Sequence, residues 1–393
     1  MSYALGVIVF VVALLVSVML HEFGHFATAK HYGMKATKFF IGFGPTLWST
    51  RRGETEYGVK AIPAGGFVKI IGMTPLEDVE PGDEDRVFYK QPPVRRFVVL
   101  VAGSLAHLII AVLVVFACIA ATHDDPIIAD LRVSRTPTCI TADSSQPCTP
   151  SDPRAPAYGV LRKGDVIVSV NGQDVSSQSS ATLSDIVGKN AGRPVTFVVM
   201  RAGHDQTLRV TPIPFNLDGK TVGRIGVESE LVPRHVSTTQ AFGRTFTALG
   251  SFFTSTVKAL GDLPHQISLI LQNKPRGNGA ASVVDIARVS GQVAQAHVSL
   301  GERIASLMLI IAQVNFFIGI FNLLPLLPLD GGHIAILGFE EARSRLYRRI
   351  GRRDPGRVDL LKIMPVTYAV VALFIGVSLL LVYAGIVNPI RIQ

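Results

Sequence analysis

The feature that most constrains this chain is an H-E-x-x-H motif at the end of a long apolar run. The run extends from Leu5 to Leu20, and His21, Glu22 and His25 follow it without a break. If the run is helical, as its length predicts, the two histidines lie one turn apart on the same face. Two imidazoles in that arrangement can bind one Zn²⁺, and Glu22 can take a proton from a water on the metal.

The position of this motif argues for a metal site over a chance match. An H-E-x-x-H spacing can arise by chance in any helix, so the letters alone do not decide. Ionisable side chains at the end of a membrane-length apolar helix are energetically costly, and such residues typically serve a function. We therefore interpret His21 and His25 as metal ligands and Glu22 as the catalytic base.

The composition favours a membrane protein that carries one soluble module. Hydrophobic residues make up 48% of the 393 residues, and they are concentrated in a few long runs. A bilayer crossing needs about 20 apolar residues. The runs that approach or exceed this length are Leu5–Leu20, Phe97–Ala121, Ile304–Leu329 and Pro365–Val387. We expect a multi-pass α-helical protein with four transmembrane helices, the third of them interrupted at Asn322, Pro325 and Pro328.

The basic residues predict how the chain lies across the membrane. The net charge is +9 at pH 7, but Lys and Arg flank the apolar runs, so they indicate topology and no nucleic-acid partner is expected. They follow the metal motif over positions 30–52 and are densest over 343–362. The positive-inside rule puts both stretches in the cytoplasm. The N-terminus and residues 123–224 then lie outside, and His21 and Asp330 both reach the inner side.

The apolar runs and the polar stretches between them divide the chain into four parts. They are the first half of a membrane core at 1–121, an extracytoplasmic α+β domain at 122–230, an amphipathic helical connector at 231–303 and the second half of the core at 304–393. In the α+β domain, strands are expected at Val166–Gly172, Val195–Met200 and Thr207–Val210. A short helix is expected between them at Leu183–Val187.

Two further segments are expected to associate with the membrane. Short β-like runs broken by glycine fill Phe39–Met73, and they predict one or two hairpins that lie against the membrane face. In the connector, breaks are expected at Pro264 and over 275–279. The stretch Phe242–Leu271 has phenylalanine and leucine at near-helical spacing, so it lies either in the interface plane or against the soluble domain.

A catalytic zinc site needs a third protein ligand, which the H-E-x-x-H helix does not supply. Asp330 is the favoured residue, because it ends a proline-broken apolar segment. Broken backbone at membrane depth is tolerated only inside protein or beside a wet cavity. The alternative role of Asp330 is a helix-end cap or a turn residue. His333 and His31 are weaker candidates, and Asn322 either caps the helix break or faces the substrate.

The three cysteines carry no catalytic signature. Cys118 lies inside an apolar run and is expected to serve packing. Cys139 and Cys148 fall in a segment predicted outside the cytoplasm, where disulfides persist. A local disulfide between these two cysteines and two free thiols are both left open.

Several motifs, taken in order, resemble one known family. The first is His21-Glu22-Phe23-Gly24-His25, and the last runs from Asn322 to Gly331 and contains Leu329-Asp330-Gly331. Between them lie a hairpin-like segment at Ile62–Lys69 and a segment at Ala155–Gly172 that is similar to a PDZ signature. Together they resemble the site-2 protease family of intramembrane zinc metalloproteases, in its bacterial branch with four transmembrane helices and a PDZ domain between the second and the third.

This resemblance implies a cofactor, a substrate class and a location. It implies that His21, His25 and Asp330 bind Zn²⁺ and that Glu22 activates the hydrolytic water. The family cleaves transmembrane segments of single-pass proteins in the bacterial inner membrane, often anti-sigma factors that a site-1 protease has already trimmed. Its PDZ domain screens substrates by size or binds new carboxyl ends.

Residues that contact the substrate are expected in two places. A substrate must be extended to be cut, since helical amides are already hydrogen-bonded, and an extended segment can pair with the edge of a strand. Gly66, Phe67 and Val68 in the hairpin segment are therefore expected to contact it. Asn322 is the second expected contact.

Two departures from the family pattern stand out. Gly103-Ser104-Leu105-Ala106-His107 occurs where the family usually shows G-P-x-x-N, so His107 replaces an asparagine near the active site. Whether His107 touches the metal is left open. The segment Ser134–Asp152, which carries two of the cysteines, is an addition to the PDZ fold.

Two competing interpretations remain. One is a membrane zinc protease of another type, whose third ligand is a glutamate on a later helix; Glu340 and Glu341 are the nearby candidates. The other is a non-catalytic PDZ adaptor that binds membrane proteins without turnover. The presence of all four motif residues, two histidines, a glutamate and an aspartate, favours an active enzyme.

Overall fold

Four helices in the described part of the chain are long and apolar enough to cross a membrane. They are α1 (Tyr3–His31), α2 (Pro93–Thr122), α7 (Leu300–Asn322) and α9 (Leu360–Val387). Each one contains a predicted apolar run or most of it, and each exceeds the ~20 residues that a crossing needs. The prediction of four helices of crossing length is confirmed.

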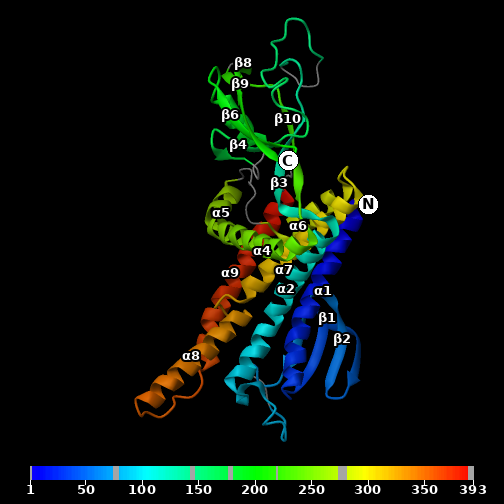
Figure 1. Ribbon diagram of the computed structural model, residues 1–393. Coiled ribbons are helices and arrows are strands. Elements are labelled where there is room, and N and C mark those ends of the chain that lie inside the picture. The colour runs from blue at the N-terminus through cyan, green and yellow to red at the C-terminus, as the bar shows by residue number, and fades with distance from the viewer. Residues whose placement is uncertain are drawn as a thin grey trace. The chain divides into compact units, whose positions relative to one another are not determined.

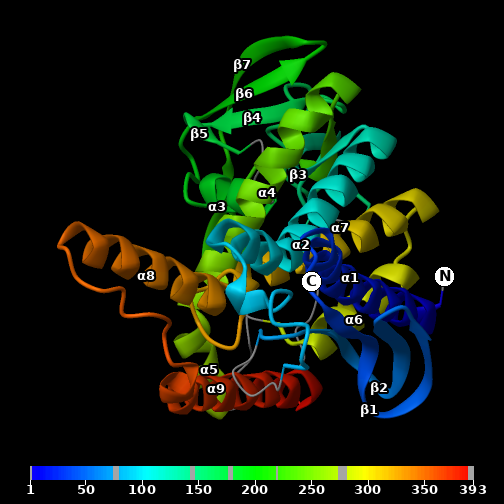
Figure 2. The same cartoon turned by 90° about the horizontal axis from the view of Figure 1, so that it is seen from below.

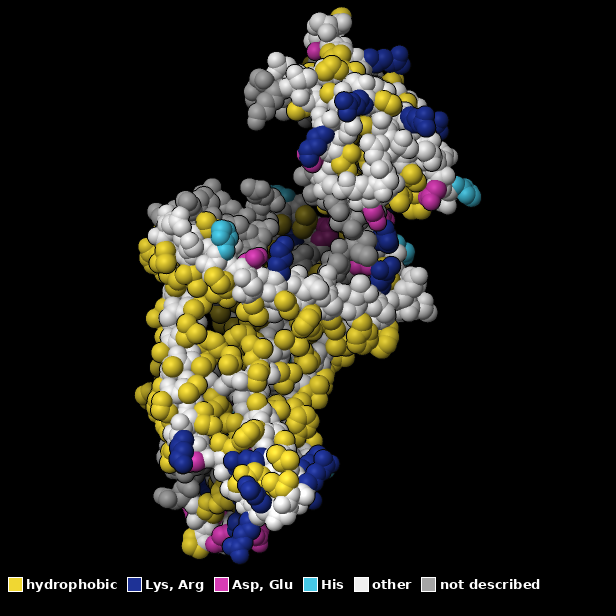
Figure 3. Space-filling view, turned by 90° about the vertical axis from the view of Figure 1, so that its left-hand side faces the viewer, with side chains coloured by type: hydrophobic (Ala, Val, Ile, Leu, Met, Phe, Trp, Pro, Cys, Tyr) yellow, Lys and Arg dark blue, Asp and Glu magenta, His cyan; other side chains and the backbone are white. Residues whose placement is uncertain are grey.

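The computed structural model describes residues 2–73, 79–141, 147–175, 180–217, 220–272 and 281–387. The chain forms two compact units. Unit 1 comprises Met1–Cys118 and Thr245–Gln393, and unit 2 comprises Ile119–Arg244. Unit 1 contains the long helices (Figure 1). Figure 3 shows hydrophobic side chains covering the helical part of unit 1, with Lys and Arg gathered at one end.

Helix α1 continues through the H-E-x-x-H motif without a break. It starts at a Ser2 cap, whose hydroxyl oxygen accepts a hydrogen bond from the Leu5 amide. It ends past His31, where Gly33 takes a positive φ of 77° that favours glycine. The predicted spacing of His21 and His25 by one helical turn is therefore confirmed.

The third predicted crossing stops earlier than expected. Helix α7 ends at Asn322, and the segment 323–329 forms turns before α8 (Asp330–Arg349) begins. Pro325 and Pro328 lie in this segment, and neither can donate the backbone hydrogen bond that a helix requires. The predicted range Ile304–Leu329 was wrong at its end by these seven residues, although its predicted interruption points are correct.

The segment after α1 forms a single hairpin that folds back on itself. Strand β1 (Ala36–Arg52) pairs with β2 (Thr55–Ile70) in two registers, so that Lys38 lies opposite both Lys69 and Glu56. The first half of β1 is thus flanked on both sides by β2 (Figures 1 and 2). Gly42 lies at the bend. A side chain does not fit there, because a Cβ would lie 2.6 Å from the Ile62 carbonyl oxygen. One hairpin, not two, contacts α1.

Helix α6 (Val283–Gln295) packs against three of the long helices, α1, α7 and α9. The contact with α1 is made close by glycine. A Cβ at Gly6 would lie 2.4 Å from the Ser290 carbonyl oxygen, and a Cβ at Gly291 would lie 2.5 Å from the Tyr3 ring. These small residues let the two helix backbones approach.

The connector differs from its prediction at its start. Residues 231–235 belong to strand β10 (Glu228–His235), because Leu231 pairs with Leu131 of unit 2. The helices α4 (Thr238–Gly261) and α5 (Leu263–Leu271) follow, and they are separated beside Pro264 as predicted. The predicted break at 275–279 lies outside the described residues.

Helix α4 makes a contact that the sequence did not predict. Its Phe252 ring packs edge-on against Phe316 of α7, with the ring centroids 6.1 Å apart. Phe246 and Phe253 on the same helix are exposed. The part of α4 within unit 1 therefore packs on a crossing helix. Its position in the interface plane stays a prediction.

In its described residues, unit 2 has strands and one short helix between the end of α2 and the start of α4. Its main sheet has the order β10-β3-β4-β6-β7, with β5 paired to β4, and β8 pairs with β9 in a second sheet. The remaining elements are β3 (Asp124–Arg135), β4 (Val166–Val170), β5 (Gln173–Asp174), α3 (Ser180–Gly188), β6 (Val195–Arg201), β7 (His204–Val210), β8 (Ile213–Leu217) and β9 (Lys220–Arg224). The three predicted strands and the short helix are confirmed.

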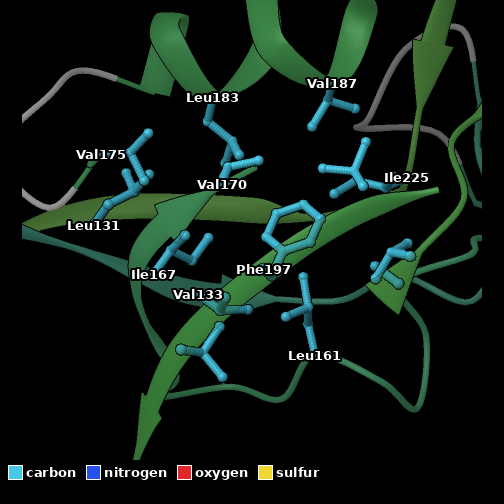
Figure 4. Packing of buried hydrophobic residues seen from close by; sticks show 14 residues of the cluster. Leu131, Val133, Leu161, Ile167, Val170, Val175, Leu183, Val187, Phe197 and Ile225 are labelled. Atoms are coloured by element: carbon cyan, nitrogen blue, oxygen red, sulfur yellow. The ribbon is translucent and has the colours of Figure 1, made fainter. Parts of the chain in front are cut away.

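The core of unit 2 lies between the sheet and α3 (Figure 4). Phe197 of β6 is fully buried there, beside Ile167 of β4 and Leu183 of α3. Burying such side chains contributes about 1.5–3 kcal/mol each. Outside the core, Cys139 and Cys148 form a disulfide, which settles the open question about these two residues. Cys118 is buried, as expected for packing.

Candidate metal centre

Two helices bring three ionisable side chains to one point inside unit 1. His21 and His25 come from α1, and Asp330 is the first residue of α8. Among the described residues they form the one group of three whose ligand atoms could hold a metal ion. The two histidines are 7% and 4% exposed. Asp330 thus begins a helix, and its carboxylate also reaches the histidine pair.

The spacing of the three ligand atoms fits a tetrahedral metal. The two Nε2 atoms lie 3.2 Å apart, and each lies 3.5 Å from Oδ2 of Asp330. Ligands bound about 2.0–2.1 Å from a tetrahedral zinc are roughly 3.3 Å from one another. Two imidazoles and one carboxylate are also a donor set that catalytic zinc uses. The residues present therefore fit this metal.

Helix α2 forms one wall of the centre. The Nδ1–H of His25 donates to the Val99 carbonyl oxygen at 2.7 Å, which turns Nε2 toward the other two ligand atoms. The Ser104 hydroxyl donates to Oδ2 of Asp330 at 3.2 Å. At Gly103 the helix touches both imidazoles, since a Cβ there would lie 2.3 Å from Nε2 of His25.

Glu22 faces the hairpin from the same turn of α1. Its Oε2 accepts a hydrogen bond from the Val68 amide of β2 at 3.1 Å. The Gly66 backbone also approaches it, because a Cβ at Gly66 would lie 3.5 Å from Cγ of Glu22. The end of β2 and the histidine pair therefore lie on either side of one carboxylate.

Comparison with known proteins identifies the family. The model of peptidase family M50 matches residues 9–353. The chain belongs to peptidase family M50. It is 37% identical to the zinc metalloprotease Rip1 of Mycobacterium tuberculosis and 34% identical to Rip1 of Mycolicibacterium smegmatis, each over the whole of both chains. It is 29% identical to the chloroplastic membrane metalloprotease ARASP of Arabidopsis thaliana, over 87% of this chain and 71% of that protein.

Three expectations are confirmed by these relatives and by the fold. This M50 peptidase is a zinc metalloprotease of the site-2 protease family, its cofactor is Zn²⁺, and it is a multi-pass membrane protein. The interpretation as an adaptor without catalytic activity was therefore wrong.

Among the described residues, the weaker ligand candidates are not members of the metal group of this M50 peptidase. His31 packs edge-on against Tyr32, and His333 lies one turn after Asp330 on α8, where it still interacts electrostatically with Asp330 and His25. Glu340 accepts a hydrogen bond from Arg96 at 3.3 Å, and Glu341 is 4.0 Å from Arg345. Among the described residues, none of these four belongs to the group that could hold a metal.

Several residues around the centre were not predicted from the sequence. Val99 contributes a backbone carbonyl, a group that every residue carries, so no sequence signal marks it. Ser104 was noticed only as a departure from the family pattern. Asn315 of α7 forms a hydrogen bond with His107 and was not predicted as part of the site. A polar residue inside an apolar run was the available signal for both side chains.

Proposed function

We propose that this M50 peptidase is an intramembrane endopeptidase that cuts peptide bonds within transmembrane segments of single-pass proteins. The observation that carries the proposal is that the two histidines of the candidate metal centre lie within a helix of crossing length. His21 and His25 lie within α1, which is of crossing length, and Val99 and Gly103 of α2 cover them. A site enclosed by two such helices is accessible to a segment that lies in the membrane, and a soluble peptide would not reach it.

The three grouped side chains are the proposed zinc ligands, namely His21, His25 and Asp330. These residues would hold a zinc that would supply a coordinated water with a pKa of about 7 and would polarise the substrate carbonyl. Glu22 takes the proton from the attacking water and later gives it to the leaving amine. The Val68 amide holds the Glu22 carboxylate in place by its hydrogen bond. Ser104 holds Asp330 in the same way.

The substrate is proposed to lie extended along the end of β2. Val68 pairs with Phe39 of β1 on one side, and its amide is directed to Glu22. A substrate strand added at Gly66, Phe67 and Val68 would bring its backbone next to the general base. Asn322, which ends α7 beside the broken segment, is the second proposed substrate contact.

Unit 2 is proposed to be a PDZ domain on the extracytoplasmic side. Its support is the PDZ-like segment Ala155–Gly172 and a sheet with one short helix packed on its core. The basic residues of α8 support a cytoplasmic position for that helix. The enzyme would then lie in a bacterial inner membrane with its active site toward the cytoplasmic leaflet. Its proposed substrates are anti-sigma factors already cut by a site-1 protease.

One experiment tests the chemistry directly. Purified protein in liposomes is assayed for bound zinc and for cleavage of a single-pass model substrate, alongside Glu22→Ala and Asp330→Ala. We expect the parent to bind about one zinc per chain and to cut. Glu22→Ala should keep its zinc and not cut, and Asp330→Ala should lose both. An Asp330→Ala protein with full zinc and activity would remove Asp330 from the site.

The location of the cut separates this function from that of an ordinary membrane-anchored protease. Mass spectrometry of the products gives the cleaved bond. A bond inside the apolar segment supports intramembrane cleavage. Cleavage confined to the flanking polar residues contradicts it.

A further inference from the structure

A buried polar pair joins α2 to α7 beside the metal centre. His107 and Asn315 are each only 1% exposed, although both lie within helices of crossing length. Polar side chains inside a membrane protein are expensive, and they persist when they pair or serve a function. The helices come close here, since a Cβ at Gly319 of α7 would lie 3.1 Å from the Ser104 carbonyl oxygen.

The hydrogen bonds of this pair define the tautomer of His107. The Asn315 amide nitrogen donates to the Ile311 carbonyl oxygen at 2.8 Å, so Oδ1 of Asn315 faces away from it. That Oδ1 atom lies 2.8 Å from Nδ1 of His107. An amide oxygen only accepts, so Nδ1 of His107 carries the proton and donates it. The ring is thereby held in one orientation.

The held ring packs on one of the proposed zinc ligands. The centroids of the His107 and His21 rings lie 5.1 Å apart, with a 40° angle between the planes. His25 is oriented by its hydrogen bond to Val99. His21 has no such support, because its Nδ1 is buried without a hydrogen bond of normal geometry to the described residues. The His107 ring and the Gly103 backbone are the neighbours that orient the His21 ring.

We propose that His107, held by Asn315, is a positioning residue that orients His21 for zinc binding. The proposal rests on the proposed ligation of zinc by His21, His25 and Asp330. A ligand imidazole needs an outer partner that limits its rotation. His25 receives it from the α2 backbone, and His21 receives it from the His107 ring and from the contact at Gly103. His107 thus acts through His21 and is not itself a ligand.

The test measures metal binding by the purified full-length protein without any substrate. Zinc affinity is obtained by competition with a chelator, and the visible absorption of the Co²⁺-loaded protein reports ligand geometry. The variants are His107→Phe, which keeps a ring but no donor, and Asn315→Leu, which removes the acceptor. We expect each to weaken zinc binding roughly tenfold and to shift the Co²⁺ spectrum. The double variant should lose little more than either single one.

Two further variants separate positioning from general damage. Asn315→Asp keeps an acceptor for His107 and should restore most of the affinity lost in Asn315→Leu. Cys118→Ala alters another buried α2 side chain whose sulfur lies near the Ala305 carbonyl of α7. It should leave both zinc affinity and the Co²⁺ spectrum unchanged.

The outcomes are distinct. Zinc affinities within twofold of the parent for both His107→Phe and Asn315→Leu would overturn the proposal. So would an Asn315→Asp protein no better than Asn315→Leu, or an equal loss in Cys118→Ala, since either result indicates a merely structural role. A parent that binds no zinc, or an Asp330→Ala protein that keeps it, contradicts the proposed zinc ligation instead. In that case the proposal on His107 falls with it.

Discussion

At the scale of single residues, the centre depends on the absence of a side chain at Gly103. A Cβ at this position would lie 2.3 Å from Nε2 of His25 and 2.7 Å from Cε1 of His21. Neither atom can retreat freely, because His25 is hydrogen-bonded to Val99 and His21 packs against His107. The glycine therefore sets how closely α2 approaches the two proposed histidine ligands.

We predict that Gly103→Ala weakens zinc binding while the helices still form. The added methyl group would occupy the space between the two imidazoles, so zinc affinity should fall by roughly tenfold or more. Zinc content after dialysis and cleavage of the model substrate measure the effect. Gly376→Ala is the matched control, because no atom lies within 4 Å of a Cβ at this position of α9. Equal zinc content in the two variants would contradict the prediction.

At the scale of elements, one strand and one helix meet at Glu22, the proposed general base. The end of β2 donates its Val68 amide to Glu22 of α1. Within the hairpin, Phe67 stacks on Phe40 of β1 with the ring centroids 5.6 Å apart. A backbone amide in this position can orient the carboxylate without adding a charge.

We predict that Val68→Pro reduces cleavage by roughly a hundredfold while zinc content is kept. Proline lacks the amide hydrogen, so Glu22 loses its partner and the strand edge loses a donor. Val68→Ala keeps that hydrogen and should retain most of the activity. Cleavage rate and bound zinc are measured side by side on both variants. A Val68→Pro protein as active as Val68→Ala would show that this amide plays no part.

The stability of a second pair of elements, β4 and β6, is expected to depend on pH. Asp165, just before β4, is 2% exposed and accepts two hydrogen bonds of 2.7 Å from Arg201 of β6. Burial by itself raises the pKa of Asp165, but the bonds from Arg201 and from the Arg162 amide outweigh it and leave the pKa below its ordinary value. A carboxyl with a lowered folded-state pKa stabilises the fold above its unfolded pKa of about 3.9. That stabilisation is lost as the pH falls through the folded value.

We therefore expect β4 and β6 to become less protected below about pH 4. Hydrogen exchange in the full-length protein, corrected for intrinsic rates, measures the protection of their amides. Asp165→Asn should lower that protection at neutral pH by about 2 kcal/mol and should respond less to acid. If parent and variant lose protection equally between pH 5 and pH 3, the pair does not cause the acid response.

At the scale of the whole molecule, one site ties together distant parts of the chain. His25 and Asp330 lie about three hundred positions apart in sequence, yet their side chains approach to 3.5 Å. A ligand that binds only the folded state stabilises it by mass action. A metal held by both ends of unit 1 would therefore resist separation of α1 from α8.

We predict that removing zinc destabilises unit 1. At free zinc a thousandfold above its dissociation constant, the stabilisation is about 4 kcal/mol. Thermal unfolding in detergent, with and without a chelator, measures it. Glu22→Ala should keep the chelator effect, because Glu22 is not a proposed ligand, and Asp330→Ala should lose most of it. A chelator effect of equal size in Asp330→Ala would mean that zinc stabilises the fold elsewhere.

Much of the architecture was predictable because it is local. A run of apolar residues long enough to cross a membrane is visible directly, and so is a spacing of one helical turn between His21 and His25. The approach of Asp330 to the histidine pair was predictable, because it follows a proline-broken apolar run and broken backbone at membrane depth occurs only inside protein or beside a wet cavity. The sequence alone thus determined four crossing helices, a metal motif and the family it resembles.

Only the tertiary structure decided how these parts surround the candidate metal centre. The Val99 carbonyl, the Ser104 hydroxyl and the His107–Asn315 pair act across helix contacts between residues far apart in the chain. The double pairing of β1 with β2 and the packing of Phe252 on α7 are non-local as well. Such contacts follow from packing of the whole chain, and backbone groups are identical at every position. A local pattern can mark a polar residue in an apolar run, but it does not specify the partner that this residue meets in the fold.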